Sequence, residues 1–416
     1  MSPKPSTADT YPVRPKPLSG VVVLDITRVV AGPYCSMILA DLGATVIKVE
    51  NPAEPDYTRD FPPFLTSPGG ERFSAYFAQF NRHKLAMTLD LASGEGKQVL
   101  LDLAAKADVV VENFRAGVMD RLGVGHRELL AVNPRLVYTA ISGFGQTGPY
   151  RCRPSYDNNA QATGGLWAMN GEPDRPPLRV GTIIGDLAAT TYAVIGTLAA
   201  LRHAERTGEG QLVDVSQQDS VLTLTESAVI SYTVDGQVAA PLGNAHPFVR
   251  PYQLYPCKDG YVFFGGYTDK FWRLTCALFD EPGWADDPEI DSMAKRFDSK
   301  VYERRVRPLL QRWFADRTKV ELEQLAADQV PLSAIKTMDE IVADPHIAAR
   351  DMVVDVDYPD FGRLEMIGTP IKLGATPIDP RGVAPRVGEH TDLLLRTFAG
   401  LDDEKIAALR AAGVVS

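Results

Sequence analysis

The stretch Gly20-Val-Val-Val-Leu-Asp-Ile26 begins the part of the sequence that decides the fold, because it is a short apolar run suited to a buried parallel strand. Gly32-Pro33 then begins a helical pattern, and Gly43 suits the left-handed position that ends such a helix. Apolar residues recur through that pattern at Met37, Ile38, Leu39 and Leu42. A second strand is expected at Val46–Val49. Together these segments predict a strand–helix–strand unit of about thirty residues.

The same alternation continues along the chain. Helical patterns are expected at about residues 94–106, 126–132 and 186–204. Strand patterns are expected at residues 108–111, 136–141 and 211–215. Repeated strand–helix–strand order predicts an α/β domain, Rossmann-like in plan, whose parallel sheet is covered by helices on both faces.

The pattern changes after about residue 248. Tyr261–Phe264 predicts a strand, and helices are expected at about residues 269–279 and 301–327, which together indicate a smaller α+β domain. The C-terminal part has a strand-rich piece at Val353–Leu373 and a last helix near Thr391–Phe398.

Composition excludes several classes of protein. The 416 residues are 45% hydrophobic and 23% charged, the balance of a globular chain with more than one domain. A net charge of -10 disfavours nucleic acid as a partner. The scattered Cys and His residues form no metal-binding motif. The four separated cysteines suggest free thiols in a cytoplasmic protein. No apolar run approaches the roughly 18 residues of a membrane span, so we expect no membrane partner.

The turn after the first strand, Thr27-Arg-Val-Val-Ala-Gly-Pro33, has neither GxGxxG nor GxxxxGK[ST]. This disfavours a nicotinamide dehydrogenase and a P-loop enzyme. The glycine-rich stretch Gly143-Phe-Gly-Gln-Thr-Gly-Pro149 is either a tight loop or a lid over a substrate. Three arginines, Arg28, Arg115 and Arg121, each follow a strand. Each one alone is typical of a surface residue, and together they could bind phosphate groups by charge-assisted hydrogen bonds.

Asp186 follows Gly185 where an apolar run meets the long helical pattern. Taken alone, a Gly-Asp pair in this place is most simply an N-cap, because an aspartate there accepts hydrogen bonds from the free amides of the first turn. The rest of the chain favours a chemical role, and we expect that both roles can hold.

An ordered set of short motifs gives the chain its resemblance to a family. The motifs are Leu24-Asp-Ile-Thr-Arg-Val-Val-Ala-Gly-Pro33, Asp41-Leu-Gly-Ala-Thr-Val-Ile-Lys-Val-Glu50, Val111-Glu-Asn-Phe114, Phe144-Gly-Gln-Thr-Gly-Pro149, Gly185-Asp186 and Gly388-Glu-His-Thr-Asp392. From about residue 17 to 416 the chain resembles the class III CoA-transferases, among them the formyl-CoA:oxalate, carnitine and succinyl-CoA:dicarboxylate CoA-transferases.

The resemblance implies an architecture. Residues 1–16 are polar and Pro-rich and are expected to form a flexible N-terminal arm. After it, a large Rossmann-like domain (17–230) leads through a linker (231–248) to an inserted small α+β domain (249–340). Residues 341–416 are a linker and the return to the large domain, which both chain ends therefore build. Two such subunits interlock as a homodimer.

The resemblance also implies a mechanism with Asp186 as the nucleophile. Its carboxylate attacks an acyl-CoA thioester and forms a mixed anhydride, which the released CoA converts into an aspartyl-CoA thioester. A carboxylic acid acceptor then takes the CoA. The helix start keeps Asp186 ionised, and Gly185 leaves room for the acyl group.

CoA itself, as part of the substrate, is expected to contact the residues that match the family's binding stretches. They are Val30, Ala31, Asn51, Leu89, Asp90, Leu91, Ala92, Asn113, Phe114, Arg115, Arg121, Ser142, Gly143, Phe144 and Gly145. Two positions depart from the family pattern: Asn51 replaces an arginine, and Ser142 stands where formyl-CoA transferases have a lysine. No metal is expected.

Two alternatives stay open. The α-methylacyl-CoA racemases share the fold but use a His-Asp pair, where this chain has Tyr156-Asp157; a tyrosine with a pKa of about 10 is a poor base at neutral pH. Asp157 then suits a structural role, binding backbone amides in a turn. A non-catalytic CoA-binding dimer is the other alternative. If the acceptor is a dicarboxylic acid, Arg250 or His246 is a candidate for its distal carboxylate, or a plain surface residue.

Overall fold

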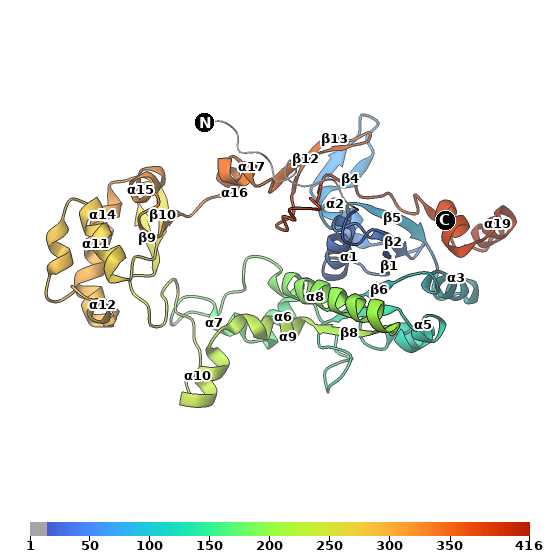
Figure 1. Ribbon diagram of the computed structural model, residues 1–416, viewed down its shortest axis with the longest axis horizontal. Coiled ribbons are helices and arrows are strands. Elements are labelled where there is room, and N and C mark those ends of the chain that lie inside the picture. Colours follow the sequence, from blue (N-terminus) through green and yellow to red (C-terminus); the bar gives the residue numbers. More distant parts are fainter. Residues whose placement is uncertain (1–14) are drawn as a thin grey trace. The chain divides into compact units, whose positions relative to one another are not determined.

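The computed structural model describes residues 15–416 (Figure 1). The predicted N-terminal arm, apart from Pro15 and Lys16, lies outside the described residues. The chain forms two compact units. The first contains the residues up to Trp167 together with Arg179–Val234 and Pro345–Ser416; the second contains Ala168–Leu178 and Asp235–Asp344.

A six-stranded sheet forms the centre of the first unit, and all of its strands are parallel. Its members are β1 (Val22–Asp25), β2 (Thr45–Glu50), β5 (Lys84–Thr88), β6 (Val109–Glu112), β7 (Val137–Ser142) and β8 (Gln211–Ser216). Their order in space is β5-β2-β1-β6-β7-β8. Successive strands are added outward from β1 on one side of the sheet and outward from β6 on the other. This is the doubly wound order, and the point at which the strand order reverses lies between β1 and β6. The prediction of an α/β fold with a large parallel sheet is therefore confirmed.

Helices bury both faces of this sheet. On one face, α1 (Ala31–Asp41) and α8 (Ile184–Thr207) pack with Val23 and Val46; on the other, α3 (Gly94–Ala104) and α5 (His126–Val132) pack with Leu24 and Ile47. Neighbouring strand residues alternate between the two cores, as the pleat requires. Because each fully buried aliphatic side chain contributes about 1.5–3 kcal/mol, the apolar runs in the sequence suffice to specify these strands.

Helix α8 is, by length and composition alone, apolar enough to cross a membrane, which the sequence prediction overlooked. Its buried residues include Ala189, Ala193 and Leu201, and they belong to the core that α1 and the sheet share. Thr190 also donates a hydrogen bond of 2.8 Å to the carbonyl of Ala31. These contacts are those of a core helix in a globular domain.

Strand β5 and helix α2 (Ala75–Asn81) were not predicted. The strand begins with a lysine, and Lys84 is nevertheless buried, because its ammonium group is bound by polar partners inside the protein. The polar residue hid the strand from a search for apolar runs. The C-terminus lies beside this strand: Ser416 donates its amide to Thr88 Oγ1 at 2.8 Å, and His390 donates its amide to the carbonyl of Ala86 at 2.8 Å.

Shorter elements complete the first unit. They are η2 (Tyr57–Asp60), the hairpin β3 (Phe64–Thr66) and β4 (Arg72–Ser74), α4 (Val118–Leu122), α6 (Asp157–Thr163), α7 (Leu166–Met169), α9 (Gln217–Leu222), η3 (Thr223–Thr225), α10 (Ala228–Asp235), α17 (Pro345–Ala349), the hairpin β12 (Val353–Tyr358) and β13 (Gly362–Ile367), α18 (Thr391–Leu394), η6 (Leu395–Ala399) and α19 (Asp403–Ala411). Helices α7 and α10 each run across a boundary between the units. The last helix, α19, was not predicted.

The second unit packs helices on a three-stranded antiparallel sheet, β11-β10-β9. Its elements are β9 (Gln253–Cys257), β10 (Gly260–Phe264), α11 (Asp269–Leu278), η4 (Pro282–Asp286), α12 (Met293–Phe297), α13 (Ser299–Val301), η5 (Tyr302–Val306), α14 (Arg307–Ala315), α15 (Lys319–Ala326), β11 (Leu332–Ala334) and α16 (Met338–Val342). The single helix predicted at 301–327 is wrong. It is interrupted after Ala315, because Thr318 caps a new helix and accepts the amide of Glu321 at 3.2 Å.

Candidate active site

A cavity of about 650 Å³ lies in the first unit at the carboxyl edge of the parallel sheet. The segments that follow β1, β2, β5, β6 and β7 line it, together with the first turns of α8 and α9. In open α/β sheets, ligands bind at this edge, at the point where the strand order reverses. Here that point lies between β1 and β6, and Arg28 and Asn113 bridge it: the Arg28 amide donates to Asn113 Oδ1 at 3.0 Å, and Asn113 Nδ2 donates to the Arg28 carbonyl at 2.7 Å.

Most of the residues that the sequence analysis selected meet in this cavity. They are Val30, Ala31, Asn51, Leu89, Leu91, Ala92, Asn113, Phe114, Arg115, Arg121, Ser142, Gly143 and Asp186. Asp90, Phe144 and Gly145 do not line it. Asp90 instead accepts the amide of Ala92 at 2.9 Å, and Phe144 packs edge-on against Tyr150.

Asp186 is not the N-cap of its helix, so that part of the prediction is wrong. It is the third residue of α8, whose N-cap is Ile183. The capping acceptor comes from Asp157 at the start of α6: its Oδ1 accepts the amide of Gly185 at 2.7 Å and the amide of Asp186 at 3.4 Å. Asp157 therefore binds backbone amides, but those of α8 and not those of its own turn. The side chain of Asp186 is left free for another purpose.

Burial, and after it the negative charge of Asp157, raise the pKa of Asp186 to about 7. A hydrogen bond from the Gln217 side-chain amide to Asp186 Oδ1 opposes that shift. The expectation that the helix start keeps Asp186 fully ionised is therefore wrong: the N-terminal partial charge of α8 is outweighed by burial and by the neighbouring carboxylate. Near neutral pH both protonation states of Asp186 are populated.

Gln217 is a site residue that the sequence analysis missed. It is the first residue of α9, directly after β8, and it lines the cavity beside Asp186. A polar residue at the carboxyl end of a sheet strand was the available signal. Its amide can hold one carboxylate oxygen of Asp186 in place and leave the other oxygen free to react.

Several arginines surround the outer part of the cavity. Arg28, Arg115 and Arg121, which the sequence placed near one edge, all line it, and Arg151 and Arg153 join them from the loop before α6. Within residues 15–416 none of these five guanidinium groups forms an ion pair with a carboxylate. Cations without a carboxylate partner around a cavity of an acidic protein suit a phosphorylated ligand.

Asn51, which replaces the family's arginine, has a local role. Its Oδ1 accepts the amides of Ala53 at 2.8 Å and Glu54 at 3.2 Å, so it shapes the turn that follows β2. Arg28, in contrast, lies 5.5 Å from the ring centre of Phe114 and faces the cavity. The positive charge around this cavity therefore comes from the segments after β1 and β6 and from the residue 151–153 loop.

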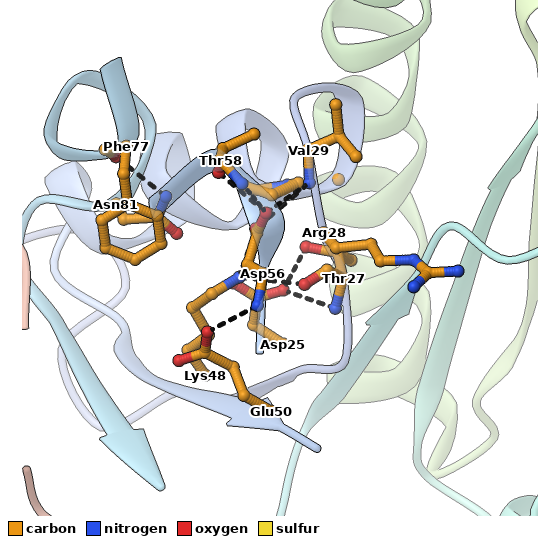
Figure 2. A network of polar contacts seen from close by, with 12 residues as sticks. Asp25, Thr27, Arg28, Val29, Lys48, Glu50, Asp56, Thr58, Phe77 and Asn81 are labelled. Atoms are coloured by element: carbon orange, nitrogen blue, oxygen red, sulfur yellow. Dashed lines mark hydrogen bonds and ion pairs between the residues drawn. The ribbon is translucent and has the colours of Figure 1, made fainter. Parts of the chain in front are cut away.

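The loop after β1 is held in an unusual conformation. Val29 has a φ of 73°, which a β-branched residue rarely adopts and which costs about 1–3 kcal/mol. Asp56 stabilises it by accepting the amide of Val29 at 3.2 and 3.1 Å, and Lys48 binds both Asp56, at 3.2 Å, and the carbonyl of Thr27, at 2.9 Å. Figure 2 shows this network beneath the loop, with the Arg28 side chain pointing away from it. The strain thus lies where the loop forms the cavity wall.

A second buried ion pair supports the same loop. Asp25 accepts hydrogen bonds from Lys84 at 2.8 Å, from Ser36 Oγ at 2.7 Å and from the amide of Thr27 at 3.0 Å. Burial alone would raise the pKa of Asp25, but the ammonium groups of Lys84 and Lys48 lower it to about 2. Asp25 is therefore a permanent anion beneath the cavity.

The glycine-rich loop after β7 has two residues in left-handed conformations, Gly145 and Gly148, both with a φ of 81°. Asp214 accepts the amide of Gln146 at 2.9 and 3.1 Å and ties the loop to β8. A lid function stays a prediction. Among residues 15–416 no cluster of three or more His, Cys, Asp or Glu side chains is arranged to hold a metal ion; that no metal takes part also stays a prediction.

The chain matches the model of CoA-transferase family III over residues 18–391. It is 39% identical to a succinyl-CoA:mesaconate CoA-transferase of Haloarcula hispanica over 91% of this chain and 95% of that protein. It is 36% identical to a succinate–glutarate CoA-transferase of Agrobacterium fabrum, over 91% of this chain and 95% of that protein. A crystal structure of a CAIB/BAIF family protein from Brucella suis has 34% identity and a TM-score of 0.80, and the match covers 92% of this chain and 99% of that chain.

The similarity extends through the strands, loops and helix starts that form the cavity, since all of them lie within the matched residues. This chain therefore belongs to CoA-transferase family III and is an enzyme that transfers CoA between an acyl-CoA and a carboxylic acid.

Proposed function

We propose that this enzyme transfers CoA from succinyl-CoA, or from a related dicarboxylic acyl-CoA, to a carboxylic acid acceptor through covalent intermediates on Asp186. The observation that carries the proposal is the position of Asp186: a half-buried carboxylate in the inner wall of an arginine-lined cavity, bound by Gln217 and not used as a helix cap. A structural aspartate at a helix start would instead be bound to backbone amides.

The steps follow from the chemistry of a carboxylate and a thioester. An oxygen of Asp186 attacks the thioester carbonyl, and the carbon–sulfur bond breaks. CoA departs as a thiolate, and a mixed anhydride between Asp186 and the donor acyl group is formed. The thiolate then attacks the aspartyl carbonyl and expels the donor as a free carboxylate, which leaves an aspartyl-CoA thioester. The acceptor carboxylate attacks that thioester to form a second anhydride. The thiolate finally attacks the acceptor's carbonyl carbon, and the new acyl-CoA and free Asp186 result.

Residues around Asp186 suit these steps. The Gln217 amide donates to one oxygen of the free carboxylate, and it can donate equally to the carbonyl oxygen of the acylated aspartate. We propose that CoA lies along the loops after β1, β5 and β6, with its phosphates at Arg28, Arg115 and Arg121. Asp90, Phe144 and Gly145 are the least supported of the proposed contacts, because they do not line the cavity.

The named activities of relatives support the choice of substrates. One relative is a succinyl-CoA:mesaconate CoA-transferase, and another is a succinyl-CoA–D-citramalate CoA-transferase of Chloroflexus aurantiacus, 35% identical over 96% of this chain. We extend the proposal to the interlocked cytoplasmic homodimer and the domain division that the resemblance implies. Exposed apolar residues of α10, among them Ile230 and Val234, support a covering partner subunit.

The racemase alternative needs a base beside the thioester. The residue before Asp157 is Tyr156, which is 70% exposed, and Asp157 is committed to the amides of α8. Neither Tyr156 nor Asp157 therefore supplies the base of a His-Asp pair, so we retain CoA transfer as the proposal.

The rate of transfer should rise with pH through about 7, because only ionised Asp186 attacks and burial with the Asp157 charge places its pKa there. Asp157→Asn keeps an oxygen for the Gly185 amide but removes the charge. The pKa of Asp186 should then fall, and the acid limb of the profile should move to lower pH. The check is kcat/KM for the acyl-CoA against pH for both proteins, because this ratio reports the free enzyme, with exposed Asp316→Asn as control. An unmoved acid limb in Asp157→Asn would contradict the assignment.

Replacing Arg115 and Arg121 by Ala should raise the KM for the acyl-CoA by about tenfold or more and leave kcat nearly unchanged, because each charge-assisted contact is worth about 1.5–3 kcal/mol. The dependence of KM on salt should also weaken. Arg127→Ala is the matched control, because Arg127 is exposed on α5 and lies outside the cavity. An unchanged KM in the double variant would place the phosphates elsewhere.

A further inference from the structure

A second cavity, of about 480 Å³, lies in the same compact unit and borders the first turn of α8. Its wall includes Ile183 and Leu187, which stand within one helical turn on either side of Asp186, and the aromatic residues Tyr34, Tyr76 and Phe80. Asp186 itself lines the first cavity. The helix start that carries the proposed nucleophile therefore separates an arginine-rich cavity from a largely apolar one.

Tyr76 connects the second cavity electrostatically with Asp186. Burial raises the pKa of the Tyr76 phenol, and the carboxylate of Asp186 is the next largest cause of the same rise. A charge acts this way only over a short distance, because water screens it farther out. Tyr76, in the wall of the second cavity, therefore lies near Asp186, whose neighbours in the chain, Ile183 and Leu187, also line that cavity.

Two arginines line this cavity, and they differ in how they are bound. Arg82 is buried and satisfied: its Nε and Nη2 donate to Asp41 at 2.9 and 2.6 Å, and its Nη1 donates to the carbonyl of Ile367 at 2.7 Å. Arg179 is exposed and has no carboxylate partner among residues 15–416. Its guanidinium donates a hydrogen bond of 3.2 Å to the carbonyl of its neighbour Val180.

The segment that joins Arg179 to Asp186 is anchored. The buried Gln161 of α6 accepts the amide of Val180 at 3.1 Å and donates to the carbonyl of Thr182 at 3.2 Å. Its Nε2 also donates to Asp157 at 2.7 Å, and Asp157 in turn accepts the amide of Gly185. One helix thus fixes the backbone next to the free guanidinium and the backbone next to the proposed nucleophile.

We propose that the second cavity holds the acyl chain of a short dicarboxylic acid and that Arg179 binds its distal carboxylate. The proposal rests on Asp186 as the nucleophile and names the substrate class of that site. A protein of net charge -10 repels a dianionic acid, so a free cation is needed to hold one. A guanidinium binds a carboxylate through two parallel hydrogen bonds, and the apolar wall accommodates the methylene groups between the two carboxyl groups.

This assignment differs from the sequence candidates for the distal carboxylate, His246 and Arg250. His246 Nδ1 accepts the amide of Val249 at 3.2 Å. Arg250, like Arg179, donates to a backbone carbonyl, that of Phe297 at 3.4 Å, so the two arginines differ in their place and not in their kind of partner. His246 and Arg250 belong to the second compact unit, whereas Arg179 belongs to the unit that contains Asp186.

The test compares glutarate with pentanoate, which has the same number of carbon atoms and lacks the second carboxylate. For each acid the KM as acceptor, or the inhibition constant where it is not turned over, is measured for the native enzyme, Arg179→Gln, Arg179→Lys and the control Arg127→Gln. Arg179→Gln should raise the KM or inhibition constant for glutarate by about 10- to 100-fold. The constant for pentanoate and the kcat should stay nearly unchanged. Arg179→Lys should recover part of the loss, because it keeps the charge without the planar fork.

The role of Arg179 would be overturned if Arg179→Gln weakened the binding of glutarate and of pentanoate equally, or if it left the binding of glutarate unchanged. A failure of the proposed function looks different: the native enzyme would then acquire no acyl or CoA label on Asp186 from succinyl-CoA. Because Arg179 is exposed and forms no ion pair or hydrogen bond with another side chain among residues 15–416, its variants should unfold at the same temperature as the native enzyme.

Discussion

Asp186→Asn should abolish CoA transfer, with a loss on the order of 10⁴-fold or more in kcat. An asparagine amide cannot attack a thioester, and no second nucleophile of the first cavity is bound in the same way. The substitution keeps the size of the side chain and an oxygen that accepts from Gln217, so the fold and the binding of the acyl-CoA should survive. The loss should therefore appear in kcat while the binding constant for the acyl-CoA stays close to the native value.

The covalent step can be measured directly. Native enzyme incubated with succinyl-CoA and then with hydroxylamine should carry a hydroxamate on the peptide that contains Asp186, and borohydride should reduce the thioester at the same residue. Asp186→Asn should show neither product, whereas Asp157→Asn should show both, because Asp157 binds the amides of α8 and is not the proposed nucleophile. Modification of a different carboxylate, such as Glu50 in the same cavity, would assign the nucleophile elsewhere.

The sequence predicted the sheet well wherever strands are apolar. β1, β6 and β7 are buried on both faces and appear as mostly apolar runs, and β2 keeps Val46, Ile47 and Val49 around the buried Lys48. Gly43 marks the end of α1 with a φ of 109°. β5 failed this test because Lys84 is buried as part of an ion pair, and a single-residue scale cannot represent a charge whose partner lies 59 positions away. The same reason explains why the support of the Val29 loop by Lys48 and Asp56 was not foreseen.

The candidate site was predictable to the extent that it follows strand ends. Arg28, Arg115 and Arg121 come together because the carboxyl ends of parallel strands share one edge. The side-chain partners of Asp186 were not predictable in that way. Gln217 and Asp157 reach it from α9 and α6, and only the folded chain shows that one binds its carboxylate while the other replaces it as the helix cap. Burial and the charge of Asp157 raise the pKa of Asp186, and the hydrogen bond from Gln217 opposes that rise.

Lys84→Met should lower the free energy of unfolding by about 3–5 kcal/mol, the largest stability effect we expect from one substitution. Methionine has nearly the volume of lysine, so packing is preserved, but Asp25 becomes a buried anion without its closest cation. Thermal or urea unfolding of the first unit gives the measurement. Lys106→Met is the matched control, because Lys106 is exposed at the end of α3 and forms no ion pair within residues 15–416.

The pH dependence of this variant separates the loss of a charge pair from a loss of packing. In the native enzyme the pKa of Asp25, about 2, lies below its ordinary 3.8, so the pair stabilises the fold at neutral pH and this contribution falls as the pH drops toward 2. Without Lys84, burial should raise that pKa above 3.8, so the variant should lose stability as the pH rises from about 4 to 7. A deficit that is the same at both pH values would indicate packing. Adding Asp25→Leu to Lys84→Met should then restore part of the stability, because a buried pair can be replaced by apolar residues more easily than it can be broken.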